Sequence, residues 1–206
     1  MQSVSYNQSA GTAALIAGVG GPLYSVAFVI LYVFKVAPDL GLTLASLFLM
    51  LGGLLSVVVL VALYFNLREL EPAYALLGLV LGLAGALGGA THGAYDLANQ
   101  LHPPSPEVLA VAGYPNMADP RGLATFGLLG LGLVIFGRLM SRSDKFPARL
   151  GTLAIVVGIL NIVIYLARLI ILTPTNPIVL VVAGATGIFI SPAFYIWLGM
   201  RLRALP

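Results

Sequence analysis

The most regular feature of the chain is a series of six apolar runs, separated by short stretches that carry most of the charges. The runs cover residues 13–34, 41–66, 74–98, 122–140, 150–172 and 178–200. Each is close to or above the roughly 20 residues that a helix needs to cross a hydrocarbon core about 30 Å thick. The fourth run reaches that length only if the guanidinium of Arg138 extends to the interface. The pattern predicts six transmembrane segments.

These runs are apolar on every face, and this indicates helices. A transmembrane strand would alternate apolar and polar residues over about ten positions. A helix satisfies its own backbone hydrogen bonds within lipid, which a single strand cannot do. We therefore predict an all-α polytopic membrane protein, with residues 1–206 forming one transmembrane helical-bundle domain. The residues before the first run lack the positive charge of a secretory signal, so that run is expected to remain as a helix.

Composition supports a membrane location and excludes several kinds of site. Of the 206 residues, 60% are hydrophobic and only 8% are charged, and the mean hydropathy is +1.03. The lipid bilayer is thus the expected partner, and without a basic cluster no binding of nucleic acid is expected. The chain has no cysteine, which excludes disulfides, thiolate metal sites and cysteine nucleophiles.

The distribution of Lys and Arg predicts the orientation of the segments. With the N-terminus inside, the inner side would carry seven basic residues and the outer side three. The inner set is Arg68, Arg138, Arg142, Lys145, Arg149, Arg201 and Arg203, and the outer set is Lys35, Arg121 and Arg168. Because basic residues are retained on the cytoplasmic side, both termini are predicted to be cytoplasmic. The Pro-rich connection 99–121 would then be an outer loop.

Small residues in the third segment predict how the helices pack. Two ladders run along it: Gly78, Gly82, Ala86 and Ala90, and Gly85, Gly89 and Gly93. Helices in lipid associate through close backbone approach at such residues. We therefore expect this helix at the centre of the bundle, in contact with two neighbours. Matching small surfaces are expected from Gly52 and Gly53, from Gly127, Gly130 and Gly132, and from Gly184 and Gly187.

Two prolines lie inside the predicted helices. Pro22 is in the first apolar run and Pro192 is in the last. Each removes an internal hydrogen bond, so each is expected to bend or loosen its helix. The sequence leaves open whether these positions are static kinks or hinges.

Two polar stripes at membrane depth are the candidate site. Both follow a spacing of i, i+4 and i+7, which places the members of each stripe on one helix face. They are His92, Asp96 and Asn99 in the third segment, and Asn161, Tyr165 and Arg168 in the fifth. We predict an outer pocket between these helices, with Asp96 and Arg168 paired or joined by water, because an unpaired charge is expensive in lipid. The alternative is that both charges reach the membrane interface independently.

The sequence predicts no metal and no cofactor. His92 and Asp96 would need a third ligand for a zinc site, and only His102, Glu107 or Asp119 in the outer loop could supply it. His92 alone could be the axial ligand of a haem or a chlorophyll-type pigment. A histidine beside an aspartate is more often a hydrogen-bonded structural residue, so this remains a secondary interpretation.

Parts of the chain resemble a group of small bacterial proteins. The stretches are HGAYDLAN, DPRGLATFGLLGLGLVIFGRLM, FPARLGTLAIVVGILNIVIYLARLIIL and PAFYIWLGMRL, most of them within the C-terminal 90 residues or so. They look like bacterial multipass proteins that are grouped as domains of unknown function. The resemblance implies a six-helix protein of the bacterial inner (plasma) membrane. It implies no activity and no catalytic residue.

Two functions are compatible with these features. The chain lacks the common catalytic motifs, which argues against an enzyme. The first hypothesis is an accessory subunit or binding scaffold, whose small-residue faces would pack against other membrane subunits or a second copy of the chain. The alternative is a small transporter or sensor that uses the outer polar pocket.

The predicted orientation can be tested at the segment 141–149, SRSDKFPAR. Because the chain has no native cysteine, Ser143→Cys would introduce a single thiol there. A membrane-impermeant maleimide should label this thiol in inverted vesicles but not in intact cells. Labelling in intact cells would reverse the orientation and move the predicted pocket to the cytoplasmic side.

Overall fold

The computed structural model describes residues 4–107, 123–171 and 176–205, and all of the regular structure in these ranges is helical. In the labels used below, η marks a π-helical segment. The elements are α1 (Val4–Val26), η1 (Ala27–Val33), α2 (Pro38–Leu67), α3 (Pro72–Leu101), η2 (Leu123–Leu128), α5 (Leu129–Met140), α6 (Ala148–Ile170), α7 (Pro177–Ala185), η3 (Thr186–Ile190) and α8 (Ser191–Arg203). The predicted all-α fold is confirmed.

The elements join end to end into six rods that are long and apolar enough to cross a membrane. These spans are α1 with η1, α2, α3, η2 with α5, α6, and α7 with η3 and α8. The first helix begins at Val4, well before the predicted residue 13. Apolar content marks the hydrocarbon core, whereas a helix continues wherever its polar side chains find partners. Asn7 is such a case, because it accepts a hydrogen bond from Nδ2 of Asn66 at 2.9 Å.

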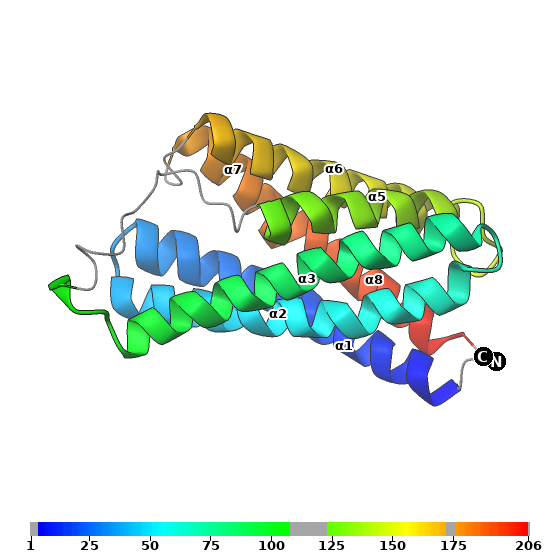
Figure 1. The fold of residues 1–206 in the computed structure, drawn as a ribbon, viewed down its shortest axis with the longest axis horizontal. Helices are drawn as coiled ribbons and strands as arrows, with labels where there is room; N and C mark the ends of the chain where they lie inside the picture. Colours follow the sequence, from blue (N-terminus) through cyan, green and yellow to red (C-terminus); the bar gives the residue numbers. More distant parts are fainter. Residues whose placement is uncertain (1–3, 108–122, 172–175, 206) are drawn as a thin grey trace.

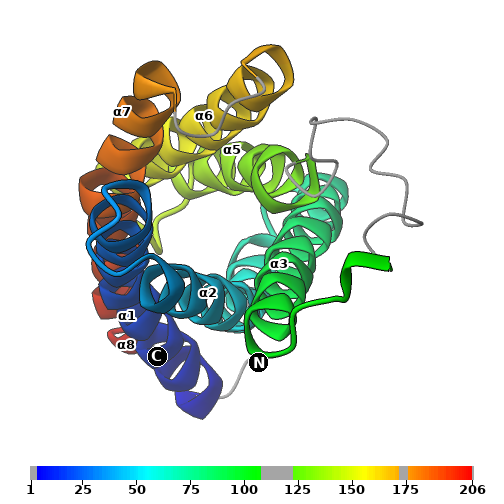
Figure 2. The same ribbon diagram turned by 90° about the vertical axis from the view of Figure 1, so that its left-hand side faces the viewer.

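The six spans form a ring. α2 packs between α1 and α3, and α3 also packs against α5 and η2. α5 packs against α6, α8 packs against α1, and contacts of α6 with α7, η3 and α8 close the ring. Figure 2 shows this arrangement along the bundle. α3 contacts two neighbouring spans as predicted, but it takes a place in the ring and not at its centre.

Glycines allow the backbones of neighbouring spans to approach closely. A Cβ atom on Gly53 of α2 would lie 2.5 Å from the carbonyl oxygen of Ala86 on α3. A Cβ atom on Gly132 of α5 would lie 2.7 Å from the amide nitrogen of Gly82. Real Cβ atoms do not approach backbone atoms this closely, so these crossings require glycine. The predicted matching of small surfaces is confirmed for these two crossings.

The apolar core lies in the half of the bundle that carries the two chain ends and the connections 68–71 and 141–147, here called the terminal half (Figure 1). Large buried side chains from several spans pack together in it. The fully buried ones include Leu63, Phe136, Met140, Phe194 and Leu202. The opposite half, here called the distal half, contains the connection between η1 and α2 and the C-terminal end of α3.

Hydrogen bonds join four separate parts of the chain at the end of the terminal half. Lys145, in the connection between α5 and α6, donates from Nζ to the carbonyl oxygen of Asn66 at 3.2 Å. Arg201 of α8 donates from Nε to the carbonyl oxygen of Lys145 at 2.7 Å. Together with the bond between Asn66 and Asn7, these contacts connect α1, α2 and α8 to one loop. The terminal half is therefore held by polar contacts as well as by packing.

All three described π-helical segments lie in the distal half. π-helical turns are rare and occur frequently at functional sites. η3 ends at Ile190, two residues before Pro192, which lies in the first turn of α8. Proline cannot donate a backbone hydrogen bond and its ring crowds the preceding turn, so a wider turn before it is a natural adjustment. α1, in contrast, continues beyond Pro22 to Val26 as an α-helix.

Two adjacent glycines in α2 provide a matched test of the packing. Gly53→Ala should lower the free energy of unfolding by about 1–3 kcal/mol, because the added methyl group would overlap the backbone of α3. Gly52→Ala should leave it unchanged or raise it by up to about 1 kcal/mol, because alanine favours a helix and nothing lies within 4 Å of the added atom. Unfolding by a denaturing detergent, followed by circular dichroism, would measure both. Equal effects at the two positions would contradict the packing described here.

Candidate functional site

A cavity of about 1280 Å³ occupies the centre of the distal half. All six spans contribute to its wall, and so do the three π-helical segments. Figure 2 shows the spans arranged in a ring. Small-molecule pockets in proteins usually measure roughly 300–1,000 Å³. This cavity therefore has room for a molecule larger than a typical small ligand.

Three glycines in the wall explain part of this empty space. Gly20 of α1, Gly52 of α2 and Gly184 of α7 all line the cavity. A Cβ atom added to any of them would meet no other atom within 4 Å. In the terminal half the corresponding volume holds phenylalanine, leucine and methionine side chains. These glycines thus leave a space that larger residues would fill.

The wall of the cavity is mainly apolar, with aromatic rings along one side. Tyr24, Phe28 and Tyr32 follow one another at a spacing of four residues along α1 and η1. The rings of Tyr24 and Phe28 are stacked with their centroids 6.0 Å apart, and those of Phe28 and Tyr32 are 5.5 Å apart. This row provides a rigid apolar surface toward the distal end of the cavity.

A cluster of three polar side chains forms one part of the wall. Nε2 of His92 on α3 lies 3.3 Å from Oδ2 of Asp96, one turn further along the same helix. Nδ1 of His92 lies 3.3 Å from Oγ1 of Thr125 on η2. Thr125 is buried, whereas the side chains of His92 and Asp96 are 14% and 30% exposed. All three residues line the cavity, so a ligand there can reach the imidazole and the carboxylate.

The two contacts of His92 define the arrangement of protons on a neutral imidazole. An ionised carboxylate can only accept hydrogen bonds, so Nε2 carries the proton and donates to Asp96. With that tautomer, Nδ1 accepts a hydrogen bond from the hydroxyl group of Thr125. The imidazole is held between two different spans and cannot turn without breaking one of these contacts.

Further polar side chains line other parts of the wall. Asn161 of α6 is almost fully buried and donates from Nδ2 to the carbonyl oxygen of Val157 at 2.9 Å. The hydroxyl groups of Ser56 on α2 and Tyr195 on α8 lie 3.0 Å apart. This last contact joins two walls of the cavity on the side nearer the terminal half.

The structure brings together some of the predicted site residues and separates others. His92, Asp96 and Asn161 line one cavity. Asn99 and Tyr165 are not part of its wall. The side chain of Arg168 lies outside the described part of the chain, so its pairing with Asp96 stays a prediction.

The predicted pocket between the third and fifth spans is larger than expected and is built differently. η2 packs against both α3 and α6, so it lies between the two predicted stripes. For this reason His92 contacts Thr125 of η2, a residue that was not among the predicted candidates. A hydroxyl group within an apolar run is a visible signal in the sequence, but its partner becomes apparent only when the helices are assembled.

Within the described ranges, no three His, Asp or Glu side chains come together in a group that could hold a metal ion. His102 follows α3 directly, and Glu107 is the last residue of the first described range and is helical, as is Pro106. Asp119 lies outside the described residues. Ligation of a haem or pigment by His92 would have to compete with the contacts that both ring nitrogens already make.

Comparisons with protein-family models, with curated proteins and with solved structures find no match to this chain. The resemblance to bacterial multipass proteins therefore stays an expectation.

The protonation of His92 can be tested by nuclear magnetic resonance. The chain has only two histidines, so ¹⁵N-histidine labelling gives two ring systems, and His102→Gln assigns them. At pH 8 the ring nitrogens of His92 should show the form protonated at Nε2. Thr125→Val should shift the Nδ1 resonance, because Nδ1 loses its hydrogen bond. A mixture of both tautomers, as in a free imidazole in water, would contradict the described contacts.

Proposed function

We propose that this chain is an integral membrane protein that binds an amphipathic small molecule in the distal cavity, in the manner of a small transporter or a sensor. The observation that carries this proposal is a large apolar cavity with one polar cluster in its wall. An apolar part of the ligand would occupy the space beside the aromatic row. A polar group would reach His92 and Asp96.

Recognition would depend mainly on the polar cluster. An apolar chain that leaves the bilayer for an apolar cavity gains little from the hydrophobic effect, because lipid is already apolar. Within the described part of the chain, Asp96 is the only Asp, Glu, Lys or Arg residue in the cavity wall. A hydrogen bond to a charged group contributes about 1.5–3 kcal/mol, which is enough to select among similar apolar molecules. The preferred ligand would donate to the carboxylate, for example through a hydroxyl or an amine.

The location of the π-helical segments gives additional support. η1, η2 and η3 all contribute residues to the cavity, and η2 carries Thr125 of the polar cluster. Pro192, two residues after the end of η3, is also part of the wall. Irregular helix geometry is common where a site binds or moves a ligand. A hinge in the wall would suit a transporter or a sensor.

An accessory subunit or scaffold was the other predicted function, and it stays a prediction. Its main support was the presence of small-residue faces that other subunits could contact. Within the chain itself, however, α3 already contacts α2 at Gly82 and Gly93 and contacts α5 at Gly85. These small-residue surfaces are therefore not available to another subunit. That support is therefore weaker than the sequence suggested, whereas the cavity needs no partner.

Binding can be tested with 16-carbon probes, hexadecanol and hexadecylamine, added to the detergent-purified protein. Both should raise its unfolding temperature, and the probe should be detected by native mass spectrometry. Asp96→Asn should weaken binding of the amine by about 10- to 100-fold, because a charged acceptor becomes a neutral one. Gly184→Phe should abolish binding, because its ring would extend into space that is now empty.

Val181→Phe is the matched control on the same helix. Val181 is 70% exposed and is not part of the cavity wall, so this substitution should bind the probes as the unaltered protein does. Equal binding by the Gly184→Phe and Val181→Phe variants would show that the probes do not occupy the cavity. In that case the proposed function would be wrong.

A further inference from the structure

The two helices α1 and α2 contact each other at both ends of the cavity wall. In the terminal half the Tyr6 hydroxyl donates to the carbonyl oxygen of Val58 at 3.2 Å, and Asn7 pairs with Asn66. In the distal half a Cβ atom on Gly41 would lie 2.8 Å from the carbonyl oxygen of Ala27, the first residue of η1, which continues α1. These contacts hold the helices together above and below their middle sections.

In their middle sections the same two helices leave a gap. Gly20 follows Asn7 by 13 residues, and Gly52 precedes Asn66 by 14. At 1.5 Å per residue both glycines therefore lie about 20 Å from the pair formed by Asn7 and Asn66. A Cβ atom on either glycine would meet nothing within 4 Å. The two open glycines thus lie at similar depth on neighbouring helices, and both line the cavity. The open space beside them is here called the gap.

Exposed apolar side chains surround this gap and also line the cavity. They are Ile16, Val19, Leu23, Leu51 and Leu54, which are between 41% and 57% exposed. All five belong to α1 or α2. Within the described residues, no other helix contributes an exposed large apolar side chain to the cavity wall. On the opposite side, Ile164 of α6 and Val179 of α7 are only 5% and 4% exposed.

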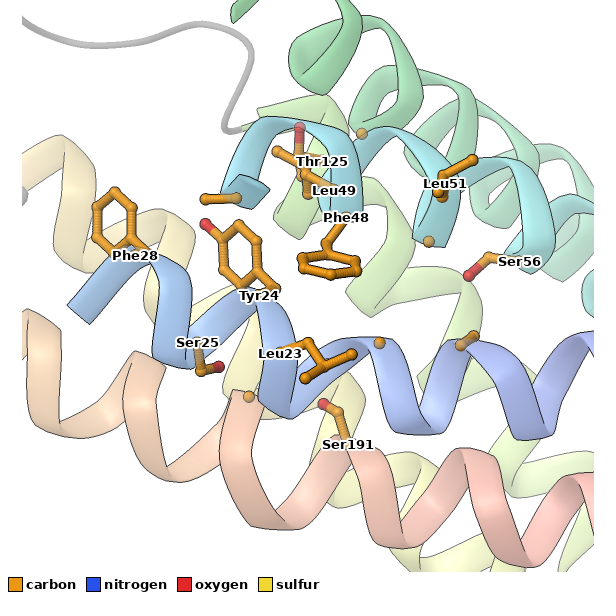
Figure 3. A pocket seen from close by; sticks show the side chains of 18 of the residues that line it. Leu23, Tyr24, Ser25, Phe28, Phe48, Leu49, Leu51, Ser56, Thr125 and Ser191 are labelled. Carbon is orange, nitrogen blue, oxygen red and sulfur yellow. The ribbon is translucent and has the colours of Figure 1, made fainter. Parts of the chain in front are cut away.

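We propose that the gap between α1 and α2 is a lateral portal through which the acyl chain of a membrane lipid enters the cavity. The gap lies near the middle of two spans, which is the depth at which a bilayer would surround the protein with hydrocarbon and not water. Its rim is apolar, so it matches the lipid phase outside and the apolar wall inside. Figure 3 shows the rings of Tyr24 and Phe48 projecting into the space between the two helices, about one helical turn to the distal side of the two open glycines.

This inference rests on the proposed function and defines its ligand more closely. A ligand that enters from the bilayer must be a lipid-like amphiphile and not a solute dissolved in water. Its chain would pass between Gly20 and Gly52, and its polar group would remain within reach of Asp96. The row of aromatic rings on α1 and η1 lies beside this path.

The portal can be tested by quenching of a single tryptophan with phosphatidylcholine brominated in the middle of its acyl chains. Trp197→Phe removes the only native tryptophan, and Phe126→Trp places one in the cavity wall. Phe126 lies on η2, which the order of spans places across the ring from the gap. In vesicles of the brominated lipid its fluorescence should fall by at least half as much as that of a lipid-facing reference.

Two reference positions calibrate the quenching. Phe189→Trp gives the lipid-facing reference, because Phe189 is 68% exposed and is not part of the cavity wall. Phe146→Trp gives the protected reference, because Phe146 is buried at the end of the terminal half. If the Phe126→Trp variant is quenched no more than the Phe146→Trp variant, no lipid chain enters the cavity and the portal is wrong. Quenching by aqueous iodide without quenching by the lipid would show entry from water and would also overturn the proposal.

Closing the gap tests the route itself. Gly20→Phe combined with Gly52→Phe should reduce quenching of the Phe126→Trp variant several-fold, because the rings fill the open space between the helices. Val26→Phe is the matched control, since Val26 is 48% exposed on α1 and outside the cavity wall. Unchanged quenching in a folded double variant would place the entrance elsewhere. Circular dichroism verifies folding, and Gly52→Leu replaces the double variant if that one does not fold.

Failure of the portal and failure of the proposed function give different results. Absence of lipid quenching in the Phe126→Trp variant with the gap unaltered, together with binding of hexadecylamine that still depends on Asp96, would refute the portal alone. Quenching by the lipid, with no effect of Asp96→Asn or Gly184→Phe on probe binding, would refute the proposed function and leave an open lipid-filled cavity.

Discussion

Close approach of helix backbones at glycine is the interaction on which the rest of this structure depends. Helices surrounded by lipid gain little from burying leucine against leucine, so contact between backbones has to hold them together. At Gly53 and Gly132 a single added methyl group would overlap the backbone of α3. These crossings set the distances between neighbouring spans, and the distances in turn determine how much space remains inside the ring.

The same residue type has the opposite effect in the distal half. Gly20, Gly52 and Gly184 face no neighbouring atom, so the missing side chains leave space and not contact. In the terminal half large side chains and the hydrogen bonds of Asn66 and Lys145 hold the spans. One end of the bundle is consequently solid and the other is hollow. This difference allows a stable fold and a large cavity to exist in one short chain.

Much of the architecture could be predicted, because it depends on local patterns. Apolar runs separated by charges gave the six spans, and helical spacing placed His92 beside Asp96. The ladders of small residues correctly indicated that α3 contacts two neighbours. The expected central position of α3 was wrong, because the pattern along one helix does not show whether the neighbours surround it or extend sideways into a ring. The contact between His92 and Thr125 was missed for the same reason, since it joins two spans.

The sequence by itself determined that the chain forms six helical rods for an apolar environment, because backbone hydrogen bonding in lipid leaves few alternatives. It also determined which polar residues lie at membrane depth. Only the tertiary structure decided which glycines touch a neighbour and which face empty space, because that depends on the position of atoms far away in the chain. The cavity and the gap between α1 and α2 are spaces between helices, and the polar cluster joins side chains of two spans. All three therefore depend on how the helices pack and not on any single helix.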